Sequence, residues 1–134
     1  MLTLISKKSL LAAIVMFSIV LSACGRTAPV KDLESQPVPT NITSADKVKK
    51  AIKLAGVSLG WIITENGSNK LRGVLNLRSH QAVISIPYST KEYSLIYQSS
   101  VNLDYDATEK TIHNNYNGWI QNLNNNIQVQ LSGM

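Results

Sequence analysis

Apolar residues recur at every second position through the middle of the chain, a period that is typical of strands with one buried face. Four such segments follow one another, at residues 59–63, 71–78, 81–88 and 93–98. Asn66 and Gly67, after the first segment, suit the positive backbone angles of a tight hairpin turn. The pattern predicts a four-stranded antiparallel meander with one apolar face and one largely polar face.

A helix is predicted before this meander. Apolar residues at three- and four-residue spacing run from Ala45 to Ala55, Thr43 or Ser44 can cap the first turn, and Gly56 can end the helix. The other faces of the helix are basic and carry Lys47, Lys49, Lys50 and Lys53. Because the apolar stripe is narrow and rich in alanine, we favour a helix that packs on the core; a helix that lies on a membrane is the alternative.

A second helix is predicted after the meander, from about residue 112 to 129. Its apolar stripe consists of Tyr116, Ile120, Leu123 and Ile127. The order helix, four strands, helix predicts a single α+β domain over residues 43–134, with both helices on the apolar face of the sheet. The polar strand residues are then candidates for the open face: Arg72, Asn76, Arg78, Ser85, Ser94 and Gln98.

The first 23 residues have a different character. Leu10 to Leu21 form an uncharged run of twelve residues, whereas a membrane-spanning helix needs about 20 apolar residues. Lys7 and Lys8 precede the run, and small residues follow it. This arrangement predicts a secretory signal peptide over residues 1–23; an uncleaved amino-terminal anchor is the alternative.

The sequence Leu21-Ser22-Ala23-Cys24 resembles the lipobox of bacterial lipoproteins. The resemblance implies that the leader is removed before Cys24, that diacylglycerol is attached to the Cys24 thiol, and that the new amino terminus is acylated. The implied partner is a lipid bilayer, bound through the acylated cysteine. Gly25 stands where an aspartate would imply inner-membrane retention, so the periplasmic face of the outer membrane is favoured for a Gram-negative source. Cys24 is the one cysteine of the chain, so no disulfide is expected.

Residues 24–42 are predicted to be the acylated cysteine and a flexible tether. The segment contains Pro29, Pro37 and Pro39 and few large apolar residues. Such a chain stays extended because it cannot bury enough surface to offset its ordering entropy. The expected role of the segment is reach, with a typical end-to-end separation of about 20 to 25 Å.

The charge of the chain excludes one class of partner. Removal of the leader takes Lys7 and Lys8 from the thirteen basic residues, so the formal charge falls from +5 to +3. The remaining basic residues are spread along the chain and do not form a concentrated patch. We therefore expect no nucleic-acid partner.

A second resemblance covers most of residues 48–131 and concerns a group of small proteobacterial lipoproteins. It is carried by four segments: Gly60-Trp61, Arg78 to Ala82, Tyr93 to Leu103 and Ile112 to Ile120. The resemblance implies class and location and transfers no catalytic residue.

The histidines are the first candidates for chemistry. His80 and His113 are the only two, which is too few for a zinc site without cysteine ligands. For His113 we favour a neutral ring bonded to the backbone or to a serine, and for His80 a position that caps or follows a strand turn. The alternative is a small hydrolase or ligand carrier in which His113, His80 and Ser99 or Ser100 form a site. No glycine-framed nucleophile elbow supports that alternative.

Aromatic and basic side chains are candidates for binding. Trp61 and Trp119 can stack on sugar rings or a peptide, although sealing the edges of a small core is the favoured role. Arg72 and Arg78 are predicted to share a strand face and to suit a carboxylate or phosphate on a partner. We therefore expect a non-enzymatic domain, without metal or cofactor, that binds or scaffolds an envelope protein, peptidoglycan or lipopolysaccharide.

Overall fold

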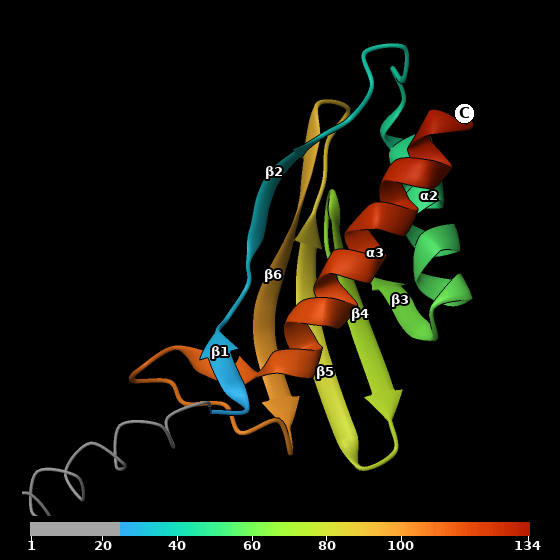
Figure 1. Ribbon diagram of the computed structural model, residues 1–134. Coiled ribbons are helices and arrows are strands. Elements are labelled where there is room, and N and C mark those ends of the chain that lie inside the picture. The colour runs from blue at the N-terminus through green and yellow to red at the C-terminus, as the bar shows by residue number, and fades with distance from the viewer. Residues whose placement is uncertain (1–24) are drawn as a thin grey trace, which may run out of the picture.

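The computed structural model describes residues 25–134, and the predicted signal peptide and Cys24 lie outside this range (Figure 1). The chain forms seven strands and two helices within the described residues. In chain order these are β1 (Thr27–Pro29), β2 (Leu33–Pro37), α2 (Ala45–Ser58), β3 (Trp61–Glu65), β4 (Lys70–Leu77), β5 (His80–Pro87), β6 (Glu92–Val101), β7 (Thr111–His113) and α3 (Asn114–Ser132).

The main sheet has five antiparallel strands in the order β2-β6-β5-β4-β3. The predicted meander is confirmed as β3 to β6, and Gly67 in the first hairpin loop has a positive φ of 101°. The fifth strand, β2, was not predicted. A separate two-stranded ribbon pairs β1 with β7, so that Thr27 lies opposite His113.

Strands β1 and β2 come from the segment that was predicted to be a flexible tether, and they correct that prediction. The segment is bonded to the domain along its length. Asn117 of α3 accepts from the Lys31 nitrogen and donates to the Pro29 carbonyl, each at 2.9 Å. Further along, Asp32 Oδ1 accepts from the Tyr97 nitrogen at 2.8 Å, and Ser94 Oγ accepts from the Ser35 nitrogen at 3.0 Å. The segment also contributes Val38 and Ile42 to the hydrophobic core, but its few apolar side chains are too widely spaced to give a hydrophobic period.

Helix α2 begins after Ser44, one of the two predicted capping residues, and continues to Ser58. Gly56 does not end the helix as predicted. It lies inside the helix, and a Cβ atom built there would approach Ile63 Cγ1 to 2.5 Å. The glycine therefore allows α2 to pack closely against β3. The core-packed interpretation of α2 is confirmed, because Val48, Ala51, Ile52 and Ala55 are buried.

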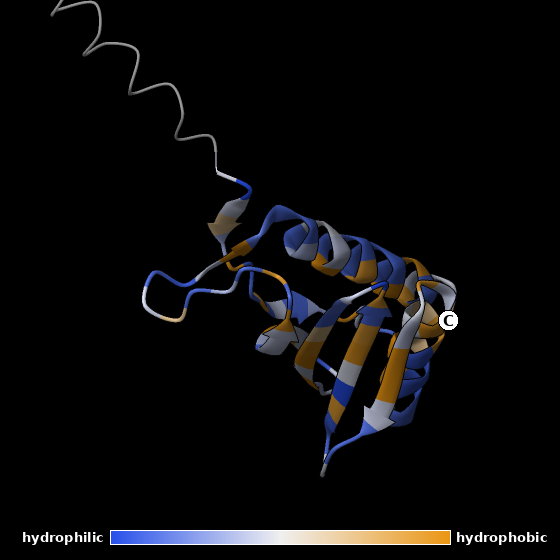
Figure 2. Ribbon diagram, turned by 90° about the horizontal axis from the view of Figure 1, so that it is seen from below, coloured by the Kyte–Doolittle hydropathy of each residue, from blue (hydrophilic) through white to orange (hydrophobic). Residues whose placement is uncertain are grey.

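Helix α3 starts two residues later than predicted, because residues 111–113 pair with β1 instead. Its predicted stripe is buried in full. Both helices pack on one face of the main sheet and leave the other face uncovered (Figures 1 and 2). The core between the layers joins α2 and α3 to the inward residues of the strands, which include Leu71, Leu75, Ala82, Ile84, Ile86, Tyr93 and Leu95. None of the helices within residues 25–134 has the length and hydropathy to cross a membrane.

Candidate functional site

The uncovered face of the sheet carries a row of apolar side chains. Ile62 of β3 pairs with Val74 of β4, and Val74 pairs with Val83 of β5, so the three residues lie side by side across three strands. We call the surface formed by this row and its polar neighbours on the same strands the open face. The row runs to β3, which is an edge strand of the sheet.

Polar side chains flank the row on both sides. In one direction Thr64, Arg72 and Ser85 pair across the same three strands, and Ile96 of β6 continues that line. In the other direction Asn76 pairs with Gln81, and the Asn76 Oδ1 accepts from Gln81 Nε2 at 2.9 Å. An apolar centre with a polar surround is the usual composition of a protein interface.

Exposure differs along the row. Ile62 is 57% exposed, whereas Val83 is only 2% exposed although it lies outside the hydrophobic core. The row is therefore accessible mainly at the β3 edge, where Ile62 lies.

Some of the residues that were predicted for the open face lie on it in the structure. Arg72 and Asn76 alternate outward on β4, and Ser85 does so on β5. The Ser94 hydroxyl is used by the Ser35 nitrogen of β2. Gln98 is the extra residue where the pairing of β5 with β6 shifts, since Ile84 pairs with Tyr97 but Val83 with Ser99.

The prediction that Arg72 and Arg78 share a strand face is wrong. β4 ends at Leu77, and Arg78 has a positive φ of 55° in the turn that leads to β5. The turn directs the chain out of the strand plane, so the alternation does not extend to Arg78. On the open face, β4 carries two basic residues, Lys70 at its first position and Arg72.

His113 caps α3 with its side chain. The Asn115 nitrogen donates to His113 Nδ1 at 3.2 Å, so this ring nitrogen carries no proton in the bond. The bond to the backbone that was predicted for the His113 side chain is confirmed. His80 is the first residue of β5 after the turn, also as predicted, and its Nδ1 donates to the Asn102 carbonyl at 2.6 Å.

The serines of the alternative hydrolase site do not meet these histidines in the described hydrogen bonds. The Ser100 and Tyr97 hydroxyls form one hydrogen bond of 2.8 Å on the inward face of the sheet. Ser99 pairs with Val83 on the opposite face. Neither serine is therefore hydrogen-bonded to a histidine that could act as its base, because His80 bonds the Asn102 carbonyl and His113 bonds the Asn115 nitrogen.

Trp61 and Trp119 line one small hollow of about 60 Å³ at the edge of the core. Trp61 is buried, and Trp119 is partly buried against the core. The volume suits a few water molecules and not a sugar ring. A Cβ atom at Gly118 would meet no atom of the described residues within 4 Å, which agrees with the predicted open space beside Trp119.

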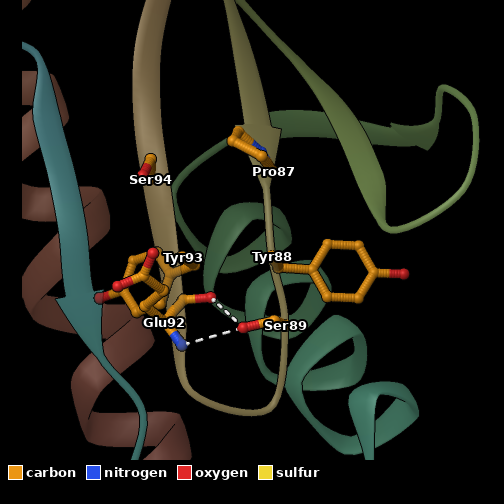
Figure 3. A pocket seen from close by; sticks show the side chains of 6 residues that line it. All are labelled: Pro87, Tyr88, Ser89, Glu92, Tyr93 and Ser94. Carbon is orange, nitrogen blue, oxygen red and sulfur yellow. Dashed lines mark hydrogen bonds between the residues drawn. The ribbon is translucent and has the colours of Figure 1, made fainter.

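A second hollow, of about 190 Å³, lies at the turn between β5 and β6 (Figure 3). Ser89 Oγ accepts from the nitrogens of Lys91 and Glu92 at 3.1 and 3.2 Å, so its lone pairs are used within the turn. Tyr88 and Tyr93 pair across the hairpin and both pack on the hydrophobic core, with their rings extending away from each other (Figure 3). These bonds give the turn its shape and leave few free polar groups for a ligand.

A buried polar cluster that the sequence did not reveal begins at Tyr93. Its hydroxyl donates to Asn124 Oδ1 and accepts from Gln128 Nε2 at 2.8 Å. Asn124 Nδ2 donates to Gln36 Oε1 at 3.2 Å, and Gln128 Nε2 also donates to the Pro37 carbonyl. Burial raises the pKa of Tyr93 to about 12, against a smaller opposing effect of Gln128. The cluster joins α3, β6 and β2, and the burial of the hydroxyl keeps it protonated.

The basic outer side of α2 forms one more exposed surface. Lys49 Nζ lies 2.7 Å from Glu65 Oε1 and links α2 to the end of β3. The hydrogen bond raises the pKa of Lys49 and lowers that of Glu65. Leu54 and Val57 are exposed beside these lysines. Within residues 25–134 no three histidine, aspartate or glutamate side chains gather in a geometry that could hold a metal ion.

Comparison with known proteins adds no relative: no family model, no characterised protein and no solved structure matches this chain.

Proposed function

We propose that the protein is an acyl-anchored lipoprotein of the cell envelope, held on the periplasmic side of a membrane, whose domain binds another envelope protein through the open face. The anchor is proposed from the lipobox resemblance at Cys24 and the short apolar run before it. The outer membrane is the proposed location, from the glycine that follows the cysteine.

The binding role is supported by one observation above all, the apolar row of Ile62, Val74 and Val83 on a face that neither described helix covers. Apolar surface surrounded by polar residues marks places where proteins dock. A protein partner is favoured over peptidoglycan or lipopolysaccharide, because sugars and phosphates require converging polar groups. The centre of the open face is apolar, and Arg72 is the cation nearest to it in the strand pairing.

The role does not require catalysis. His113 and His80 each make a hydrogen bond that fixes the backbone, and Ser100 is bonded to Tyr97. These contacts account for the chemically interesting residues as parts of the fold. A binding domain is therefore the function that the described contacts support best.

Photo-crosslinking in living cells tests this proposal. A photoreactive amino acid is introduced at Ile62 or Asn76 on the open face, and in a control variant at Val129, which is 64% exposed on α3. We expect one reproducible protein adduct from both open-face sites, no adduct from Val129, and loss of the adduct when Cys24→Ala removes the anchor. Equal labelling from Val129, or no adduct from either open-face site, would overturn binding through this face.

A further inference from the structure

One end of the domain is tied to the first described residues by a series of hydrogen bonds. The Arg26 carbonyl accepts from the Asn114 nitrogen at 2.9 Å, and the neighbouring His113 nitrogen donates to the Leu103 carbonyl at 2.8 Å. The Asn102 carbonyl next to it accepts from His80 at the start of β5. The start of the described chain, the end of β6 and the turn between β4 and β5 therefore lie at the same end of the domain (Figure 1).

This end exposes three large apolar side chains from three different segments. Leu77 ends β4 and is 45% exposed, Val101 ends β6 and is 56% exposed, and Tyr105 in the following loop is 40% exposed. Leu77 pairs with His80, and Val101 pairs with Gln81, so the two strand ends flank the first residues of β5 and their side chains project from opposite faces of the sheet at the same end. The Tyr105 ring stacks on Tyr97 with centroids 4.3 Å apart, which holds the loop against the sheet. We call the surface of Leu77, Arg78, Val101 and Tyr105 the proximal end.

The spacing between the proposed anchor and the folded domain is very short. Arg26 is already fixed by its bond to Asn114, and Cys24 is two residues before it. A fully extended chain covers at most about 3.6 Å per residue, so the two Cα atoms cannot be more than about 7 Å apart. The domain is therefore much closer to the proposed anchor than a flexible tether over residues 24–42 would have placed it. A lipid on Cys24 would hold Arg26 at the level of the lipid headgroups.

We infer that the proximal end lies against the bilayer, with Leu77 and Val101 in contact with the boundary between headgroups and acyl chains. The inference rests on the proposed acylation of Cys24. Apolar side chains near the headgroups gain burial by such contact, tyrosine rings are suited to this depth, and the cationic side chains of Arg26 and Arg78 suit lipid phosphates.

The loop after β6 is acidic, and we expect it to stay out of the contact between the proximal end and the bilayer. Asp104, Asp106 and Glu109 lie in this loop together with Lys110. Asp106 Oδ1 accepts from the nitrogens of Thr108 and Glu109, so the loop tip is a compact turn. Carboxylates are repelled by anionic lipids, and the tip is therefore expected to stay in water.

The orientation has a consequence for the open face. Strands β4, β5 and β6 extend between the proximal end and the opposite end of the sheet, where the turn between β5 and β6 lies (Figure 1). With the proximal end on the bilayer, the strands point away from the membrane surface, and the open face is steeply inclined to that surface and does not lie flat on it. A partner would reach this face by approaching along the membrane surface.

The depth of single labelled sites tests the inference. Because Cys24 is the one native cysteine, an introduced cysteine is a unique thiol in the acylated protein. Leu77→Cys and Val101→Cys report on the proximal end. Val129→Cys is the matched control for an exposed valine, and Lys91→Cys marks the opposite end of the strands. Each full-length variant is expressed, purified from membranes, labelled with an environment-sensitive fluorophore and reconstituted in vesicles of phosphatidylethanolamine and phosphatidylglycerol that contain nitroxide lipid.

We expect several-fold stronger quenching by nitroxide lipid at Leu77→Cys and Val101→Cys than at Val129→Cys and Lys91→Cys. Mass spectrometry of the same samples determines whether Cys24 carries lipid. Acylated protein in which all four sites are quenched equally would overturn the orientation and leave the anchor in place. Protein without lipid on Cys24 would overturn the anchor, and the orientation with it.

Discussion

The carbonyl oxygen of Arg26 accepts a hydrogen bond of 2.9 Å from the backbone nitrogen of Asn114. This bond joins the beginning of the described chain to the first residue of α3, 88 positions later in the sequence. It lies next to the pairing of Thr27 with His113 in the β1–β7 ribbon. The segment after the predicted lipobox is thus part of the folded domain from Arg26 onward, and the domain cannot move freely on a long linker.

Asn117→Ala is expected to loosen this segment. The side chain bonds both the Lys31 nitrogen and the Pro29 carbonyl, so its loss removes two hydrogen bonds at once. The free energy of unfolding should fall by about 1 to 2 kcal/mol, and amide hydrogen exchange should become faster at residues 27–31. Asn115→Ala on the same helix, whose side chain is exposed, is the control for the change in helix propensity. Equal exchange rates in the two variants would contradict the role of Asn117.

Two glycine substitutions should change stability in opposite directions. Gly56→Ala brings a Cβ atom to 2.5 Å from Ile63 Cγ1 and should lower the free energy of unfolding by about 1 to 3 kcal/mol. Gly118→Ala in α3 meets no atom within 4 Å and should raise it by about 0.5 to 1 kcal/mol. Urea unfolding of both variants measures the difference. A stabilising Gly56→Ala would show that α2 and β3 are not in close contact.

The hydroxyls of Tyr93 and Tyr116 should contribute differently to stability. Tyr93→Phe leaves the buried Asn124 without its donor and should cost about 1 to 3 kcal/mol. Tyr116 is also buried, but its hydroxyl has no hydrogen-bond partner among residues 25–134. Tyr116→Phe should therefore be neutral or stabilising in the same urea titration. Equal losses in the two variants would contradict the assigned hydrogen bonds.

Stability should decline at alkaline pH. Burial raises the pKa of Tyr93 from 10.0 to about 12, so the folded state keeps a proton that the unfolded state loses. The stabilisation is complete below about pH 10 and is lost as the pH rises toward 12, with a slope of at most about 1.4 kcal/mol per pH unit from this group. Burial also raises the pKa of Tyr116, which acts in the same direction. Tyr93→Phe should reduce the slope measured by urea unfolding between about pH 9 and pH 12; an unchanged slope would assign the effect to other groups.

The parts of the fold that follow a regular hydrophobic period were predictable from the sequence. The alternation in residues 71–98 specifies the meander, and the stripe from Tyr116 to Ile127 specifies most of α3. β2 has no such signal, because it is a short strand at the sheet edge with Ser35 at a positive φ of 50° and a register shift. Strands that depend on pairing with distant residues show little of their structure in their own composition.

The candidate site was predictable only in outline. Alternation places Arg72, Asn76 and Ser85 on the open face, but it extends the same face to Arg78, where a left-handed turn has already ended the strand. Alternation also places Val83, between Gln81 and Ser85, on this largely polar face. Its alignment with Val74 and Ile62 depends on the register of three strands, and register cannot be deduced from one strand alone.

The anchor at Cys24 is the claim on which the location, the orientation at the membrane and the function all depend. Mass spectrometry of the amino-terminal peptide, released from protein purified out of the membrane fraction, tests it most directly. The account predicts a mature chain that begins at Cys24 and carries acyl chains on that residue, and a Cys24→Ala variant that is not processed. An amino-terminal peptide that begins at Met1, or an unmodified Cys24, would contradict it.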